Sequence, residues 1–234
     1  GGARPPAGLA RDGLGAWVLK ALRVYRKGPT AMTAVLAAGK FQDALLEDRN
    51  GLQRCNPEDF SLRAVESMPA GEAPCLLFIH GTASSTYGSF AGLWLDAGRR
   101  RKLVDAYGDR IYAFEHRSLT EGPIANALAL VRQLPRGARL HLVTHSRGGM
   151  VGELLALAGR EGGDPVPEAE MARFLAAAAT CKGDYAPDVE RLRDLSRELA
   201  ARAIVVERFV RVACPVRGTT LASGRLDRWA SVML

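Results

Sequence analysis

Long apolar runs are absent from this sequence of 234 residues. The longest, such as Ala176–Ala179, are far shorter than the roughly 20 residues that a membrane-spanning helix needs. The first residues also lack the charged segment and apolar run that are typical of a secretory signal. We therefore expect no transmembrane span and a cytoplasmic protein.

Cysteine and aromatic residues are scarce as well. The four cysteines, Cys55, Cys75, Cys181 and Cys214, form no CxxC pair. This spacing favours reduced thiols over a zinc site or a disulfide framework. Aromatic residues make up only 6% of the chain, and a protein that binds single-stranded nucleic acid interleaves them with basic charge. The sequence thus predicts no nucleic-acid partner.

Basic charge exceeds acidic charge, with a formal net charge of +7. The basic residues are scattered, apart from one cluster at residues 99–102. That cluster has two interpretations, a solvated basic face or a phosphate-binding patch, and the scatter elsewhere favours the first.

Hydrophobic residues make up 47% of the chain, which is enough for a buried core. From residue 75 onward, apolar strands alternate with helical patterns, and this alternation predicts an α/β fold with a mostly parallel sheet flanked by helices. The predicted strands are Cys75–Ile79, Arg110–Glu115, Arg139–Thr144 and Phe209–Ala213. The predicted helices are Ser89–Tyr107, Pro123–Gln133, Arg147–Ala158 and, after the last strand, Leu221–Leu234.

Two regions depart from this alternation, and they suggest a division of the chain into residues 1–70 and 71–234. The first is predicted to be a helical and hairpin extension, and the second carries an inserted helical cap at residues 160–207. The extension contains predicted helices at Ala10–Arg26 and Thr30–Ala38, and strands at Phe41–Glu47 and Leu52–Cys55 around the turn-forming pair Asn50-Gly51. The cap contains predicted helices at Glu168–Ala179 and Pro187–Ala203.

One strand runs directly into a serine and a helix, in the sequence Thr144-His145-Ser146-Arg147-Gly148-Gly149. A serine on so sharp a turn is exposed at the end of the sheet, and small residues two positions before and after it avoid a collision. Gly148 satisfies that requirement, whereas Thr144 is bulkier than the usual glycine. The alternative is a structural serine whose hydroxyl caps the helix.

A second motif lies upstream, where the apolar strand Cys75–Ile79 ends in His80-Gly81-Thr82. Together the two motifs resemble the α/β-hydrolase family, and the lipases and esterases within it. The resemblance implies that Ser146 is the catalytic nucleophile. It also implies that the backbone N–H groups of Thr82 and Arg147 form the oxyanion hole.

Further residues have supporting roles in this interpretation. The resemblance implies that His80, Gly81 and Gly148 shape the site. His145 adjoins the serine, and His116 ends a strand at the same edge, so both are expected to line the pocket. A third stretch, Val212–Thr219, resembles the segment that follows the next strand in many bacterial lipases, although Cys214 and Val216 depart from that pattern.

The base of a catalytic triad is missing from the sequence, and no aspartate after Ser146 follows a strand in the way the family's acid does. In this family the chain order is Ser, then Asp or Glu, then His, and no histidine follows Ser146. The simplest interpretation is an incomplete C-terminus, with the fold completed by a further domain or chain. His116 is an alternative base if it reaches Ser146.

The sequence therefore predicts a serine hydrolase of the lipase or esterase type that acts on a small-molecule ester or thioester. No cofactor and no metal are expected, because no ligand cluster or phosphate-binding glycine loop is present. Two alternatives stay open: a catalytically silent interaction module of a larger protein, and an acyltransferase on the same scaffold.

Overall fold

The fold was analysed in a computed structural model that describes residues 31–47, 49–159, 164–180 and 185–214. A mixed six-stranded sheet with the order β2-β1-β4-β3-β5-β6 forms its centre. The strands are β1 (Gly51–Cys55), β2 (Leu62–Ala64), β3 (Cys75–Ile79), β4 (Ile111–Glu115), β5 (Arg139–His145) and β6 (Val205–Val212). Four of them, β4, β3, β5 and β6, are mutually parallel, while β1 is antiparallel to both β4 and β2. The predicted α/β architecture is thus present.

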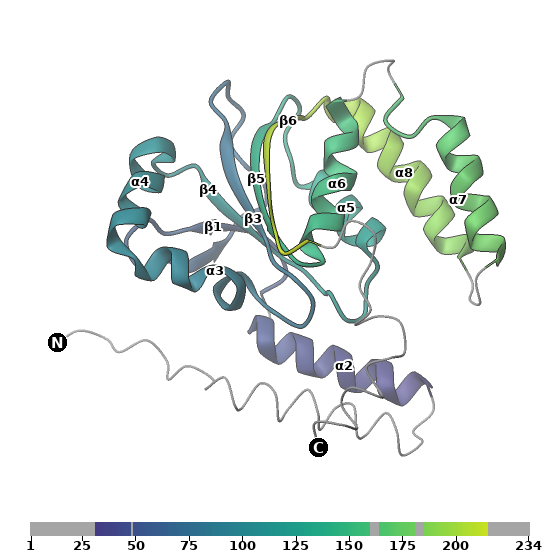
Figure 1. The fold of residues 1–234 in the computed structure, drawn as a ribbon, viewed down its shortest axis with the longest axis horizontal. Helices are drawn as coiled ribbons and strands as arrows, with labels where there is room; N and C mark the ends of the chain where they lie inside the picture. The colour runs from purple at the N-terminus through teal and green to yellow at the C-terminus, as the bar shows by residue number, and fades with distance from the viewer. Residues whose placement is uncertain (1–30, 48, 160–163, 181–184, 215–234) are drawn as a thin grey trace.

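Helices cover both faces of the sheet (Figure 1). The described α-helices are α2 (Ala31–Leu46), α3 (Thr86–Leu95), α4 (Ala97–Tyr107), α5 (Pro123–Arg132), α6 (Gly148–Ala156), α7 (Glu168–Thr180) and α8 (Ala186–Arg202). A short 3₁₀ turn, η1 (Leu157–Gly159), follows α6. α3 and α4 lie on one face, α5 to α8 lie on the other, and α2 lies apart below the sheet.

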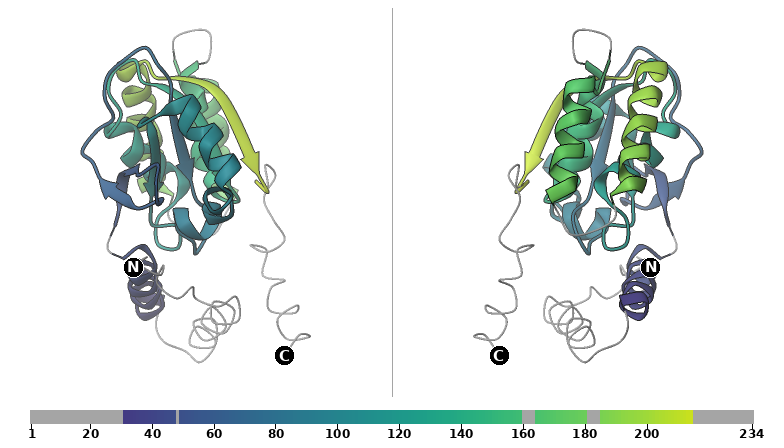
Figure 2. Two further views of the ribbon diagram at one scale, coloured as in Figure 1. Left: turned by 90° about the vertical axis from the view of Figure 1, so that its left-hand side faces the viewer. Right: turned by 90° about the vertical axis from the view of Figure 1, so that its right-hand side faces the viewer.

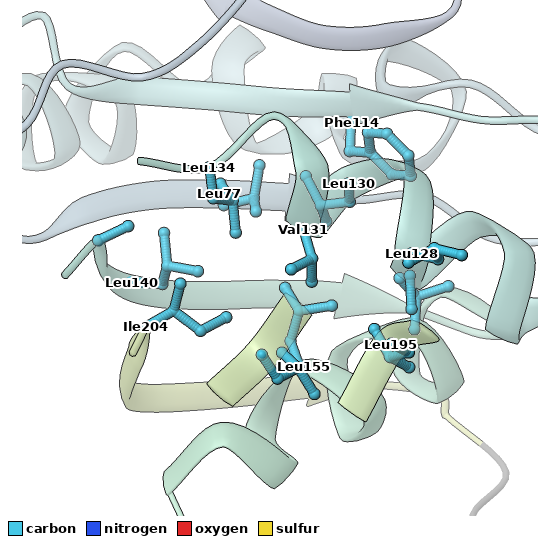
Figure 3. Close-up of a cluster of buried hydrophobic side chains, with 14 of the residues drawn as sticks. Leu77, Phe114, Leu128, Leu130, Val131, Leu134, Leu140, Leu155, Leu195 and Ile204 are labelled. Atoms are coloured by element: carbon cyan, nitrogen blue, oxygen red, sulfur yellow. The ribbon is translucent and has the colours of Figure 1, made fainter. Parts of the chain in front are cut away.

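The core explains why β3 is continuously apolar. All five of its residues are buried, and alternate side chains enter two different clusters. Leu76 and Phe78 pack with Phe90 and Trp94 of α3. Leu77 and Ile79 point to the opposite face and join the cluster shown in Figure 3, where residues of α5, α6 and α8 meet the sheet. A strand covered on both faces has no polar side, as the sequence predicted.

The N-terminal hairpin prediction is wrong in its first arm. Residues 41–46 belong to helix α2, in which Gln42 and Leu46 lie one turn apart and are both buried. The hairpin partner of β1 is instead β2, and Asn56 N–H donates to Ser61 O at 2.8 Å in the turn between them. The predicted helix at 89–107 is also divided, because Asp96 ends α3 and caps α4 through Arg99 N–H at 3.0 Å.

The helical insertion contains the two predicted helices, and α8 packs its apolar side chains into the main core. It packs beside α5, and Figure 2 shows α7 and α8 side by side on the same side of the molecule. Leu195 and Leu199 are 0% and 1% exposed within the main core. A helix whose apolar face is committed to the core is a layer of the fold.

Some predictions lie outside the described residues: the helices at 10–26 and 221–234, Cys181, and the motif beyond Cys214. Cys55, Cys75 and Cys214 are free thiols. Across the described ranges, no helix combines the length and the apolar character needed to cross a bilayer.

Candidate functional site

Ser146 lies in a strained turn between β5 and α6. Its φ of +50° is in the left-handed region, which residues with a Cβ rarely occupy. The turn is held from both sides, because Ser146 N–H donates to Val212 O at 2.9 Å and Ser146 O accepts from Gly149 N–H at 3.1 Å. Strain of this kind persists only where the surrounding structure enforces it. The strand–turn–helix geometry predicted at this serine is therefore present.

Two glycines allow the turn to lie against the end of β3. A Cβ on Gly148 would lie 2.4 Å from Ile79 O and 2.5 Å from His80 O. A Cβ on Gly81 would lie 2.8 Å from the Ser146 Cβ. Both positions thus require glycine, and Gly81 brings the His-Gly loop into direct contact with the serine.

Thr144 replaces the usual small residue without a collision. Its side chain is fully buried toward β6, with Oγ1 3.4 Å from Val210 O and 3.3 Å from Cys214 Sγ. Cys214 Sγ in turn occupies the space beside Gly149, where a Cβ would lie 2.6 Å away. Thr144 is accommodated because the neighbouring strand supplies an acceptor and a small partner.

The loop after β3 carries a second strained residue. Ala83 has φ +49°, and its N–H donates to Ser118 Oγ at 3.0 Å. Within the described part of the chain, neither the N–H of Thr82 nor the N–H of Arg147 has a hydrogen-bond acceptor. Among the described residues, both N–H groups are thus without an acceptor.

His80 ties this loop to the end of β4. Its Nε2 accepts the backbone N–H of His116 at 3.1 Å, so the ring proton lies on Nδ1, 2.9 Å from Gly81 O. Burial lowers the pKa of His80 to about 4. The imidazole is thus neutral and supports the loop.

His116 packs against His80 and forms no hydrogen bond with Ser146. It stacks on His80 with ring centroids 4.0 Å apart, and its Nδ1 lies 3.2 Å from Phe114 O. Burial lowers its pKa well below the ordinary value. No hydrogen bond joins it, or any other described histidine, to Ser146. This geometry disfavours His116 as the substitute base.

Glu115 is a buried acid that the sequence analysis did not identify. Its Oε1 accepts the N–H of Thr86 at 2.9 Å, and its Oε2 lies 3.3 Å from His80 Nε2. Burial raises the pKa of this carboxyl group. The available signal was a charged residue at the end of an apolar strand, directly before His116.

His145 lies at the end of a chain of hydroxyl groups. Its Nδ1 is 3.3 Å from Ser89 Oγ, which is 3.0 Å from Ser84 Oγ. The single proton of the Ser84 hydroxyl is donated to Ser85 O. The Ser89 hydroxyl must then donate its proton to Ser84 Oγ. The remaining bond requires that His145 Nδ1–H donates to Ser89 Oγ. The ring nitrogen left as an acceptor is then Nε2. The serine cluster after Gly81 was visible in the sequence, but its pairing with His145 was not.

The Arg147 side chain points away from solvent and binds backbone. Its guanidinium donates to the carbonyl oxygens of Ser118 and, at 2.6 Å, Glu121. Burial lowers its pKa from the ordinary value. Arg147 therefore fixes the turn at Ser146 against the loop that follows β4.

The amino-acid sequence matches a model of a protein family. Residues 47–201, more than half of the chain, match the family model described as a domain of unknown function (DUF7379). The chain belongs to this family. No curated protein and no solved structure matches it.

The DUF7379 region contains most of the site. Gly81, Ser118 and Ser146 all lie inside it, whereas Gln42 of α2 and Val212 of β6 lie outside. The described part of the DUF7379 chain contains no group of His, Cys, Asp and Glu side chains able to hold a metal ion.

Proposed function

We propose that this chain is a serine hydrolase of the lipase or esterase type, built on an α/β-hydrolase-like scaffold. The observation that carries the proposal is Ser146 at φ +50° between β5 and α6. The contact of this serine with Gly81 brings it beside the His-Gly loop, where Thr82 and Arg147 offer N–H groups that no described residue accepts. These parts correspond to the nucleophile and the oxyanion donors of acyl transfer by a serine, whereas no described histidine is bonded to Ser146 as its base.

The proposed reaction has two steps. Ser146 Oγ attacks the acyl carbon of an ester or thioester, the bond to the alcohol or thiol breaks, and the leaving group takes the serine proton. Water then cleaves the acyl-serine bond, which releases the acid and restores Ser146. The N–H groups of Thr82 and Arg147 stabilise the negative oxygen in both steps, since their positions are fixed before the reaction.

A catalytically silent interaction module is the second candidate. The observation that favours it is the lack of any described imidazole hydrogen-bonded to Ser146. A serine hydroxyl without a base stays protonated at neutral pH and is a weak nucleophile. The test therefore uses the full protein that carries this chain, so that groups outside the described residues are present.

The deciding experiment is labelling with a fluorophosphonate probe followed by mass spectrometry. We expect an adduct on Ser146 that disappears in Ser146→Ala. Ser89→Ala is the matched control, because Ser89 lies in the neighbouring hydroxyl chain and should leave the adduct in place. An adduct on another residue, or none in the folded protein, would support the silent module instead.

A further inference from the structure

The helix α2 inserts a fully buried glutamine into the loop that follows β4. Gln42 is 0% exposed, its Nε2 donates to Ser118 Oγ at 2.9 Å, and its Oε1 accepts Leu119 N–H at 3.0 Å. A buried amide is costly to leave unpaired, so these two bonds fix the loop relative to α2.

Ser118 connects this glutamine to both sides of the proposed oxyanion hole. Its Oγ accepts the N–H of Ala83 at 3.0 Å, and Ala83 directly follows Thr82. Its carbonyl oxygen accepts a bond from the guanidinium of Arg147. Gln42, Ala83, Ser118 and Arg147 thus belong to one hydrogen-bonded network.

The hydroxyl of Ser118 has a defined orientation because Gln42 is present. A hydroxyl oxygen has two acceptor sites, and the N–H groups of Gln42 and Ala83 occupy both. Without the Gln42 amide, the hydroxyl can rotate about its bond and the bond to Ala83 loses its fixed direction. The strained φ of Ala83 then lacks part of its support.

We propose that Gln42 and Ser118 are positioning residues that hold the Thr82 and Arg147 amides in register with Ser146. The inference rests on the proposed function, and it assigns a role to α2, which lies outside the matched family region. Neither residue acts on the acyl group itself. An oxyanion hole depends on donor placement, and a displacement of about 1 Å can cost on the order of 100-fold in rate.

A purely structural role for Gln42 makes a different prediction. α2 has other contacts with the domain, including the half-exposed ion pair of Asp43 with Arg117 at 2.7 Å. If Gln42 only attached the helix, its loss would lower stability and leave the geometry around Ser146 intact. The readouts must therefore report on the loop and on the serine as well as on folding.

The first readout is amide hydrogen exchange, which requires no activity. Gln42→Met keeps the side-chain size and removes both polar atoms. We expect the Ala83 amide to exchange faster on the order of tenfold, because its acceptor is no longer fixed. Lys40→Gln, an exposed change on the same helix, is the matched control and should leave this rate unchanged.

The second readout is the kinetics of probe labelling and ester hydrolysis in the full protein. Gln42→Met and Ser118→Ala should each lower kcat on the order of 10- to 100-fold, with KM nearly unchanged. The loss in the double variant should be smaller than the product of the two single losses, because both changes remove the same bond between Gln42 Nε2 and Ser118 Oγ.

The outcomes separate the two proposals. The positioning role is overturned if Gln42→Met leaves the hydrogen-exchange rate of the Ala83 amide unchanged. It is also overturned if that amide exchanges faster while kcat stays the same. In both cases the hydrolase proposal stands. Additive losses in the double variant also overturn it. A wild-type protein that forms no adduct overturns the hydrolase proposal, and with it the catalytic part of this inference.

Discussion

At the residue scale, the turn at Ser146 depends on glycines that leave room for backbone. The Cβ that Gly148→Ala adds would lie within 2.5 Å of two carbonyl oxygens, and neither can move without displacing β3. We expect a loss of about 1–3 kcal/mol in the free energy of unfolding, measured by urea denaturation. Gly92→Ala is the control, because Gly92 is an exposed residue of α3 with nothing near its missing Cβ. Equal stability of the two variants would contradict the close packing of the turn.

At the element scale, α8 belongs to the core layer. Leu195 of this helix is fully buried in the main core cluster (Figure 3). Leu195→Ala should lower the free energy of unfolding by about 2–5 kcal/mol, because it leaves a cavity. Arg193→Ala on the exposed side breaks only an ion pair with Glu190 and should change stability by less than about 0.5 kcal/mol. A small effect of Leu195→Ala in urea denaturation would favour a loosely attached cap.

At the scale of the whole molecule, two buried neutral histidines make stability depend on pH. His80 and His116 have pKa values lowered by burial, to about 4 for His80. In the unfolded chain these two rings therefore take up protons as the pH falls below about 6.5, whereas in the folded chain they stay neutral at that pH. Glu115 opposes this trend, because its raised pKa favours the folded state as the pH falls toward the ordinary carboxyl range.

The histidines outnumber the carboxyl group, so we expect stability to fall between pH 7.5 and 5. The full shift of His80 corresponds to about 3 kcal/mol, reached only near pH 4. Urea denaturation across this range checks the trend. His116→Leu removes one of the two titrating rings and should make the dependence shallower. Stability that rises on acidification would mean that the carboxyl group dominates.

The sequence by itself determined the four parallel strands, the strand–helix alternation and the Ser146 turn. These features depend on residues that are close together in the chain. The consecutive residues of β3 and of β4 are all buried, so each strand appears in the sequence as a short apolar run. Gly148 follows Ser146 by two positions. The sequence also placed His80 and Gly81 at the end of β3. Local patterns carry this information because strand burial and turn geometry are set within a few residues.

Only the tertiary structure decided the contacts between distant segments. Gln42 and Ser118 are 76 residues apart, and no periodicity in either segment indicates that they meet. Residues 41–46 were expected to form a strand, yet burial of Gln42 and Leu46 against the domain selects a helix. The pairing of His145 with Ser89, 56 residues apart, and the packing of α8 beside α5 are likewise outcomes of the fold. Such contacts depend on which surfaces the packed layers bring together, and that is a property of the whole chain.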